Sequence, residues 1–321
     1  MLPTVLANVF QMNSFAQPQL RRALMGASLL AIVTVGCSSD DTSSVVTTAG
    51  TVSGSTASTT AGDDGTAVAT PNDCTTVIAT FRAVVSANPD LTDPSLAAVC
   101  DGDVVEVQTN SMPDYLYIEA SPGDPEPSDL TFRIPLAPVV AATAGDVPAL
   151  GPIAVAVNGV AIYGPTEATG GDVLSLVGAL SECGSHNGPT GFHMHQFLWA
   201  DGVDCLYDAS EVETGSVQVG WSLDGYPIMS GLVCDDDACA TTRQLTSSWE
   251  LTNESLFASD TWNAHSYVEG SGDLDQCNGR VDADGEYRYY TTPTFPYFLG
   301  CYRGDVAADA GGGMGGMGGP P

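Results

Sequence analysis

Short apolar segments separated by turn residues dominate the chain from residue 104 to residue 304. The segments are rich in β-branched and aromatic residues and are bounded by Gly, Pro, Asp or Asn, which is typical of short strands. The pattern predicts strands at residues 104–107, 115–119, 130–136, 153–157, 217–223 and 287–291. Asn158-Gly159 and Asp224-Gly225 predict hairpin turns, because both central residues of such a turn need a positive φ. The predicted fold is therefore mainly β, of a β-rich α+β kind.

Helical spacing is limited to brief stretches. Apolar residues recur every three or four positions in residues 75–86 and 172–180, and residues 94–99 fit one further helical turn. We expect short helices at these places. Residues 74–102 are accordingly assigned to a short helical segment, which precedes a main domain at residues 103–304.

One phrase occurs twice along the chain. The first copy consists of Asn158-Gly159-Val160-Ala161-Ile162, Cys183-x-x-His186 and Phe192-His193-Met194-His195. The second copy consists of Asp224-Gly225-Tyr226-Pro227-Ile228, Cys277-x-x-Arg280 and Tyr287-Arg288-Tyr289-Tyr290. Three of the four histidines belong to the first copy and none to the second. The pattern predicts an internal duplication in which one copy kept a chemical site and the other kept the framework.

The two ends of the chain have a different composition. Arg21-Arg22, an apolar run at residues 23–35 and Cys37 resemble a bacterial lipoprotein signal, so we expect residues 1–37 to be a signal peptide with a lipobox-like end and Cys37 to carry lipid. Residues 38–73 form a Ser/Thr/Gly/Ala tether that buries too little apolar surface to order itself. Residues 305–321 are a Gly-rich flexible tail. The expected location is the cell envelope, with the lipid as the only membrane contact, or otherwise the secreted fraction.

Nine cysteines are present, and an even set of eight follows Cys37. In an exported protein such a set indicates disulfides, and thiolate zinc sites need Cys-x-x-Cys clusters that the chain lacks. The sequence leaves the connectivity open. Closeness along the chain favours the pairs Cys74–Cys100, Cys183–Cys205, Cys234–Cys239 and Cys277–Cys301. The second and fourth of these pairs would close equivalent loops in the two copies.

The net charge limits which kinds of molecule this protein is expected to bind. Against 39 acidic residues stand 8 basic ones, all of them arginine, for a formal net charge of −31. Such a surface repels nucleic acids and anionic membranes, and cations are its natural partners. A hydrated acidic exterior suited to salty surroundings explains the same composition, and nothing in the sequence indicates a protein partner.

The histidines of the first copy are candidate metal ligands. Side chains alternate along a strand, so His193 and His195 project from one face. His186 can return to them across the Gly188-Pro189 turn, and His265 is a candidate fourth ligand. Neutral imidazoles bind divalent transition metals such as Zn or Cu. The alternative, in which His193 and His195 are core residues bonded to carbonyl groups, fits the sequence equally well, and for His265 the structural interpretation is favoured.

The sequence gives less support for a calcium site or for a catalytic site than for the histidine site. Asp282, Asp284 and Glu286 alternate around Gly285 like the start of a calcium loop, but the bidentate Glu of such a loop is missing. No nucleophile elbow, phosphate-binding glycine loop or metalloprotease helix occurs. A metal-dependent hydrolase or oxidoreductase with Glu182 or Asp224 as general base is one alternative to metal binding without turnover. A structural cell-surface module without metal is another, so the sequence leaves enzyme activity open.

Several stretches together resemble the YHYH protein family. They are residues 110–115, 131–135, 183–195, 220–228, 267–280 and 295–304. The family's Tyr-His-Tyr-His motif is represented by Phe192-His193-Met194-His195, which keeps both histidines and loses both tyrosines. The resemblance implies an exported protein with a YHYH-like domain and a site at the motif, and it implies no particular reaction.

Overall fold

The computed structural model describes residues 72–120, 122–236 and 238–311. The predicted signal peptide with Cys37, nearly all of the tether and residues 312–321 of the predicted tail lie outside these ranges and stay predictions. Within the described ranges, no helix combines the length and apolar character that crossing a membrane requires.

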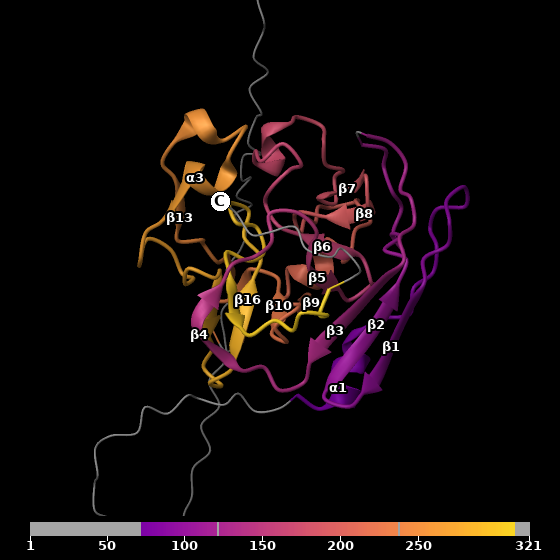
Figure 1. The fold of residues 1–321 in the computed structure, drawn as a ribbon, viewed down its shortest axis with the longest axis horizontal. Coiled ribbons are helices and arrows are strands. Elements are labelled where there is room, and N and C mark those ends of the chain that lie inside the picture. Colours follow the sequence, from indigo (N-terminus) through magenta and orange to yellow (C-terminus); the bar gives the residue numbers. More distant parts are fainter. Residues whose placement is uncertain (1–71, 121, 237, 312–321) are drawn as a thin grey trace, which may run out of the picture. The chain divides into compact units, whose positions relative to one another are not determined.

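Eight strands form the main sheet, in the order β15-β16-β10-β9-β5-β6-β8-β7 (Figure 1). Their bounds are β5 Pro152–Ala156, β6 Ala161–Tyr163, β7 Ser185–Gly188, β8 Gly191–Met194, β9 Gln218–Ser222, β10 Pro227–Met229, β15 Gly279–Val281 and β16 Tyr287–Tyr290. All five residues of β5, near the middle of the sheet, are buried. A strand covered on both faces is expected to lack polar alternation, as β5 does.

Smaller sheets and short helices surround the main sheet. The other strands are β1 Leu96–Asp101, β2 Val104–Thr109, β3 Leu130–Pro135, β4 Val140–Gly145, β11 Leu232–Cys234, β12 Thr242–Gln244, β13 Trp249–Leu251, β14 His265–Tyr267 and β17 Tyr302–Gly304. The helices are α1 Cys74–Thr80, α2 Ala209–Val212 and α3 Thr261–Ala264, with 3-10 turns η1 Val173–Ser175 and η2 Glu254–Leu256. The mainly β fold with short helices is confirmed.

The main sheet has the same topology when followed from either edge. The β5–β6 hairpin turns at Asn158-Gly159 and the β9–β10 hairpin turns at Asp224-Gly225, as predicted. Outside each hairpin lies a parallel strand, β8 or β16, and then an antiparallel edge strand, β7 or β15. The two halves meet where β5 pairs with β9, with Val155 opposite Trp221. The repeated phrase is therefore an internal duplication with pseudo-twofold pairing.

The four disulfides join the cysteines that lie closest along the chain. They are Cys74–Cys100, Cys183–Cys205, Cys234–Cys239 and Cys277–Cys301. Cys183 lies two residues before β7, and Cys277 lies two residues before β15. The duplication therefore extends to the covalent links, as the sequence predicted.

Three predictions from helical spacing need correction. The first helix is shorter than expected and ends at Thr80. Residues 94–99 are not helical, because β1 pairs with β2 along its whole length. The helix predicted at residues 172–180 is wrong except for the single turn η1. There, Asp172 accepts hydrogen bonds from the Thr261 and Tyr297 hydroxyls, and these tertiary contacts replace a continuing helix.

Two further predictions need correction. Residues 115–119 form no strand, because the Tyr115 carbonyl and the Tyr117 amide bond instead to the Asn88 side chain. The predicted flexible tail begins too early at residue 305. Ala310 is fully buried and its carbonyl accepts a hydrogen bond from the Arg133 amide, so residues 305–311 belong to the folded domain. The other five predicted strands are confirmed.

The disulfide loops differ in how much they constrain the unfolded chain. Replacing both Cys277 and Cys301 by Ala opens a link across 24 residues, and we expect the free energy of unfolding to fall by about 3 kcal/mol. The matched change at Cys234 and Cys239 opens a link across 5 residues and should cost about 2 kcal/mol. Urea denaturation of the three proteins measures both values. A larger loss at the short loop would contradict this account.

Candidate metal centre

Strands β7 and β8 bring two histidines face to face. In their antiparallel pairing His186 lies directly opposite His193. Phe192 and Met194 point into the core, so the alternation of the strand sends His193 to the other side, as predicted. Directly after β8, the amides of His195 and Gln196 both donate to the Gly184 carbonyl, which fixes the third histidine beside the other two.

Glycine is required at two positions beside the histidines. Gly184 has a φ of +75°, and a Cβ there would collide with the Gln196 carbonyl oxygen. At Gly188, a Cβ would lie 2.6 Å from Cε1 of His193. Any larger residue at these positions would push the His193 ring or the strand end away from its place.

Each of the three histidines has one ring nitrogen bonded to a backbone carbonyl. Nδ1 of His186 lies 3.0 Å from the Ala179 oxygen, Nδ1 of His193 lies 2.9 Å from the Gly191 oxygen, and Nδ1 of His195 lies 2.6 Å from the Gly164 oxygen. A carbonyl oxygen only accepts, so each Nδ1 carries the proton and each Nε2 of a neutral ring is left with a lone pair. Carbonyl groups commonly fix metal-ligating histidines in this way.

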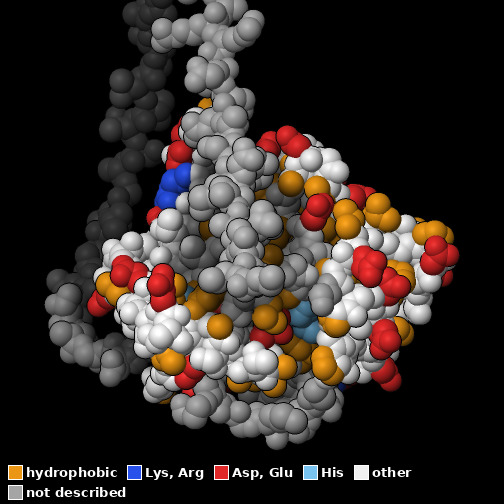
Figure 2. Space-filling view, turned by 90° about the horizontal axis from the view of Figure 1, so that it is seen from above, with side chains coloured by type: hydrophobic (Ala, Val, Ile, Leu, Met, Phe, Trp, Pro, Cys, Tyr) orange, Lys and Arg blue, Asp and Glu red, His pale blue; other side chains and the backbone are white. Residues whose placement is uncertain are grey.

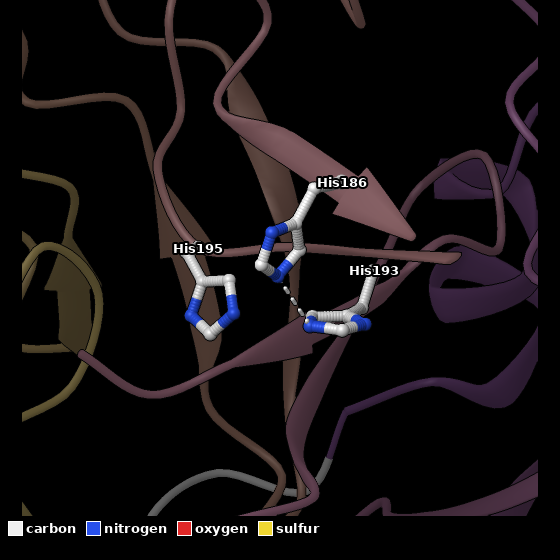
Figure 3. A group of neighbouring side chains, drawn as sticks. All are labelled: His186, His193 and His195. Carbon is white, nitrogen blue, oxygen red and sulfur yellow. Dashed lines mark hydrogen bonds between the residues drawn. The ribbon is translucent and has the colours of Figure 1, made fainter. Parts of the chain in front are cut away.

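The free nitrogens converge on one point (Figure 3). Nε2 of His186 and Nε2 of His193 are 3.0 Å apart, and one ring nitrogen from each histidine lies within 4.8 Å of the others. Three points no more than 4.8 Å apart lie within about 2.8 Å of a common centre, so a small inward movement of the rings would reach the Zn–N distance of about 2.0–2.1 Å. The geometry fits a three-histidine metal site.

Protonation is a poor alternative to a metal at this point. All three side chains are buried. Burial, with the neighbouring His186, lowers the pKa of His193 to about 3, and burial with the other two histidines lowers the pKa of His195 well below its usual value. Near neutral pH the His193 and His195 rings are therefore neutral, and Nε2 of His193 offers a lone pair toward Nε2 of His186, 3.0 Å away.

The cluster forms part of the wall of a cleft of about 780 Å³. Figure 2 shows a small area of histidine set between hydrophobic and acidic side chains. Tyr163 lines the same cleft and stacks on His193 with ring centroids 3.9 Å apart. Glu167 is also in the wall, and its Oε1 lies 3.8 Å from Nε2 of His186. This oxygen is buried and has no hydrogen-bond partner.

The second copy places a different cluster at the equivalent positions. By strand register, Arg280 corresponds to His186, Arg288 to His193 and Tyr290 to His195. Asp282 occupies the position of Gly188, and its carboxylate accepts hydrogen bonds from Arg280, Arg288 and Tyr290 at 2.9, 2.8 and 2.5 Å. Donors therefore surround an internal carboxylate in this half, whereas lone pairs surround a shared point in the other half.

The predicted calcium ligands are part of that second cluster. Arg288 also donates to both oxygens of Asp284, and this pairing lowers the pKa of Asp284 to about 2. Burial and the bond to Asp282 raise the pKa of Tyr290 to about 12. A calcium ion would have to displace two guanidinium groups from Asp282, and Glu286 bonds to Asp284 through its backbone amide.

The structure leaves three sequence candidates away from the histidine cluster. His265 is not in the group of converging nitrogens; it stacks on Phe295 and bonds to the Thr261 carbonyl. Asp224 is buried in the other half, where Tyr289 and Gly304 donate to it. Glu182 is exposed and does not line the cleft. The carboxylate at the site is Glu167, which the sequence analysis missed.

Fold and site together define a class of disulfide-linked, mainly β domain with a duplicated half-sheet and histidines in one half. The family model described as YHYH protein matches residues 131–304, more than half of the 321-residue chain. The chain belongs to the YHYH family, and the resemblance seen in the sequence is confirmed. Comparison with curated proteins and with solved structures gave no match.

The low pKa of His193 has a measurable consequence in metal-free protein. The folded-state pKa of about 3 lies below the unfolded value of 6.5, so the unfolded chain binds more protons between these values and stability falls as the pH falls through that window. From pH 7 to pH 5 the loss at this one group is about 2 kcal/mol. Urea denaturation of wild type and His193→Asn should show a steeper pH dependence for wild type. Parallel profiles would contradict the neutral ring.

Proposed function

We propose that this protein binds one divalent transition metal ion through His186, His193 and His195. The observation that carries this proposal is the convergence of three ring nitrogens whose partner nitrogens are all tied to backbone carbonyls. A metal needs neutral imidazoles with a free lone pair, and burial without a metal would leave these lone pairs facing one another. The Nε2 atoms of His186 and His193 have only each other as hydrogen-bonding partners in the described chain, and a metal ion would give both of them a ligand role.

The second copy supports the choice of a cation. There, Arg280 and Arg288 converge on the carboxylate of Asp282, so the chain itself supplies the opposite charge. At the matching place in the first copy stands Gly188, which has no side chain to offer. In the first half, ring nitrogens converge on one point, and Gly188 supplies no charged side chain to meet them. A bound cation would take the place of that missing side chain.

Zinc and copper are the metals that fit this set of donors. Three imidazole nitrogens are of intermediate softness and suit Zn²⁺ or Cu²⁺, whereas Ca²⁺ and Mg²⁺ require oxygen ligands. The proposed ion enters through the cleft, whose wall includes all three histidines.

The proposed location is outside the cytosol, with Cys37 as a lipid anchor. Four disulfides in the described domain support export, because such links persist in oxidising compartments. Export and lipidation are testable by mass spectrometry of the processed N-terminus, where a Cys37→Ala variant should lose the lipid mass.

Metal titration of the purified protein tests the proposed site. Wild type should bind one Zn²⁺ or Cu²⁺ per chain, and His193→Ala should weaken the affinity more than about 100-fold, since loss of an outer partner alone costs 10–100-fold. The matched control is His265→Asn, a buried histidine outside the cluster, which should bind the metal like wild type. Isothermal titration calorimetry with competing chelator gives each affinity.

Two results would contradict the metal site. One is equal metal affinity in wild type and His193→Ala, with circular dichroism showing that both are folded. The other is a loss of affinity in His265→Asn as large as the loss in His193→Ala. Gly188→Ala gives a second line of test, because its Cβ displaces the His193 ring without removing a nitrogen.

A further inference from the structure

The ligand set at the cluster is incomplete for a structural metal. Structural zinc sites have four protein ligands, whereas catalytic sites have three and leave the fourth position to water or substrate. In the described part of the chain, the atoms that converge within 4.8 Å come from His186, His193 and His195 alone. The three histidines also line the cleft, so a fourth ligand for a bound metal could reach it from there.

Glu167 is placed to act on a molecule at that open position. It follows β6, which runs parallel to β8, so both chain ends emerge at the same edge of the sheet. Its turn is fixed by hydrogen bonds from the Glu167 amide to Gly171 and from the Gly170 amide to Glu167, each 2.8 Å long. The carboxylate reaches the cluster without joining the converging group, and its buried Oε1 has no partner of its own. A carboxylate one water away from a metal is the usual general base.

The cleft also limits what can enter. Most of its wall is apolar or backbone, with Leu150, Pro152 and Tyr302 among the lining residues. The charged side chains in the described wall are the acids Asp146, Glu167 and Asp305, and no arginine is among them. Since the chain has no lysine, an anionic substrate would find no basic partner there. An uncharged molecule with an apolar body fits both properties.

We propose, on the basis of the metal site proposed above, that the cleft is the active site of a metal-dependent hydrolase acting on small uncharged esters or amides, with Glu167 as the proton acceptor. The substrate carbonyl enters from the cleft beside the metal. A water molecule at the open position loses a proton to Glu167 while its oxygen bonds to the carbonyl carbon. The bond from that carbon to the leaving group then breaks, and the leaving group takes the proton back from Glu167. No oxidant or reductant is needed.

The first test uses the Zn²⁺-loaded full-length chain and 4-nitrophenyl butyrate. Wild type should release nitrophenolate with kcat at least 100-fold above that of Glu167→Gln, because a general base contributes about 10²–10⁴-fold. Glu167→Gln should still bind Zn²⁺ within a few-fold of wild type. Glu213→Gln, which changes an exposed carboxylate outside the cluster and outside the cleft wall, is the matched control and should hydrolyse the ester at the wild-type rate.

The second test examines the open position without turnover. Acetohydroxamic acid, which is uncharged in neutral solution and chelates metals after losing its proton, should change the visible spectrum of the Co²⁺-loaded protein. An unchanged spectrum would overturn the proposal, as would equal rates for wild type and Glu167→Gln, or faster cleavage of mono(4-nitrophenyl) succinate than of the butyrate ester. If Co²⁺ and Zn²⁺ do not bind at all, the metal site itself fails, and that outcome is distinct because it appears before any substrate is added.

Discussion

The contact between Nε2 of His186 and Nε2 of His193, 3.0 Å apart, is the interaction on which the interpretation of this structure depends. Both rings have their protons held at Nδ1 by backbone carbonyls, and burial disfavours a second proton on His193. Two buried Nε2 lone pairs at this distance would repel if both rings were neutral, and an unmatched buried polar group is costly. A cation between them turns this repulsion into ligation.

The internal duplication shows how one framework can hold two opposite charge arrangements. Both halves have a hairpin, a parallel strand, an edge strand and a disulfide at matching places. The difference in charge comes from the matching positions on one face of the outer strands. The second half closes on itself through Asp282, whereas the first half presents Gly188 and three histidines. Substitutions at about four matching positions therefore distinguish the ionic cluster of the second half from the candidate metal site of the first half.

The sequence predicted the parts of the site that depend on short-range periodicity. Alternation along one strand placed His193 and His195 together, and the Gly188-Pro189 turn returned His186 to them. Glu167 was missed because it reaches the site through the parallel pairing of β6 with β8, which are not consecutive strands. The helix expected at residues 172–180 failed for a similar reason, since Asp172 is held by distant hydroxyl groups. Contacts between segments far apart in the sequence cannot be predicted from the periodicity of a single segment.

Anomalous X-ray diffraction from crystals of the protein grown with Zn²⁺ tests the central claim most directly. Data collected on both sides of the zinc absorption edge locate the ion without reference to activity. The account predicts one strong peak within bonding distance, about 2.0–2.1 Å, of a ring nitrogen from each of His186, His193 and His195. Zinc bound only at surface carboxylates, with the three rings unchanged and no peak among them, would contradict it.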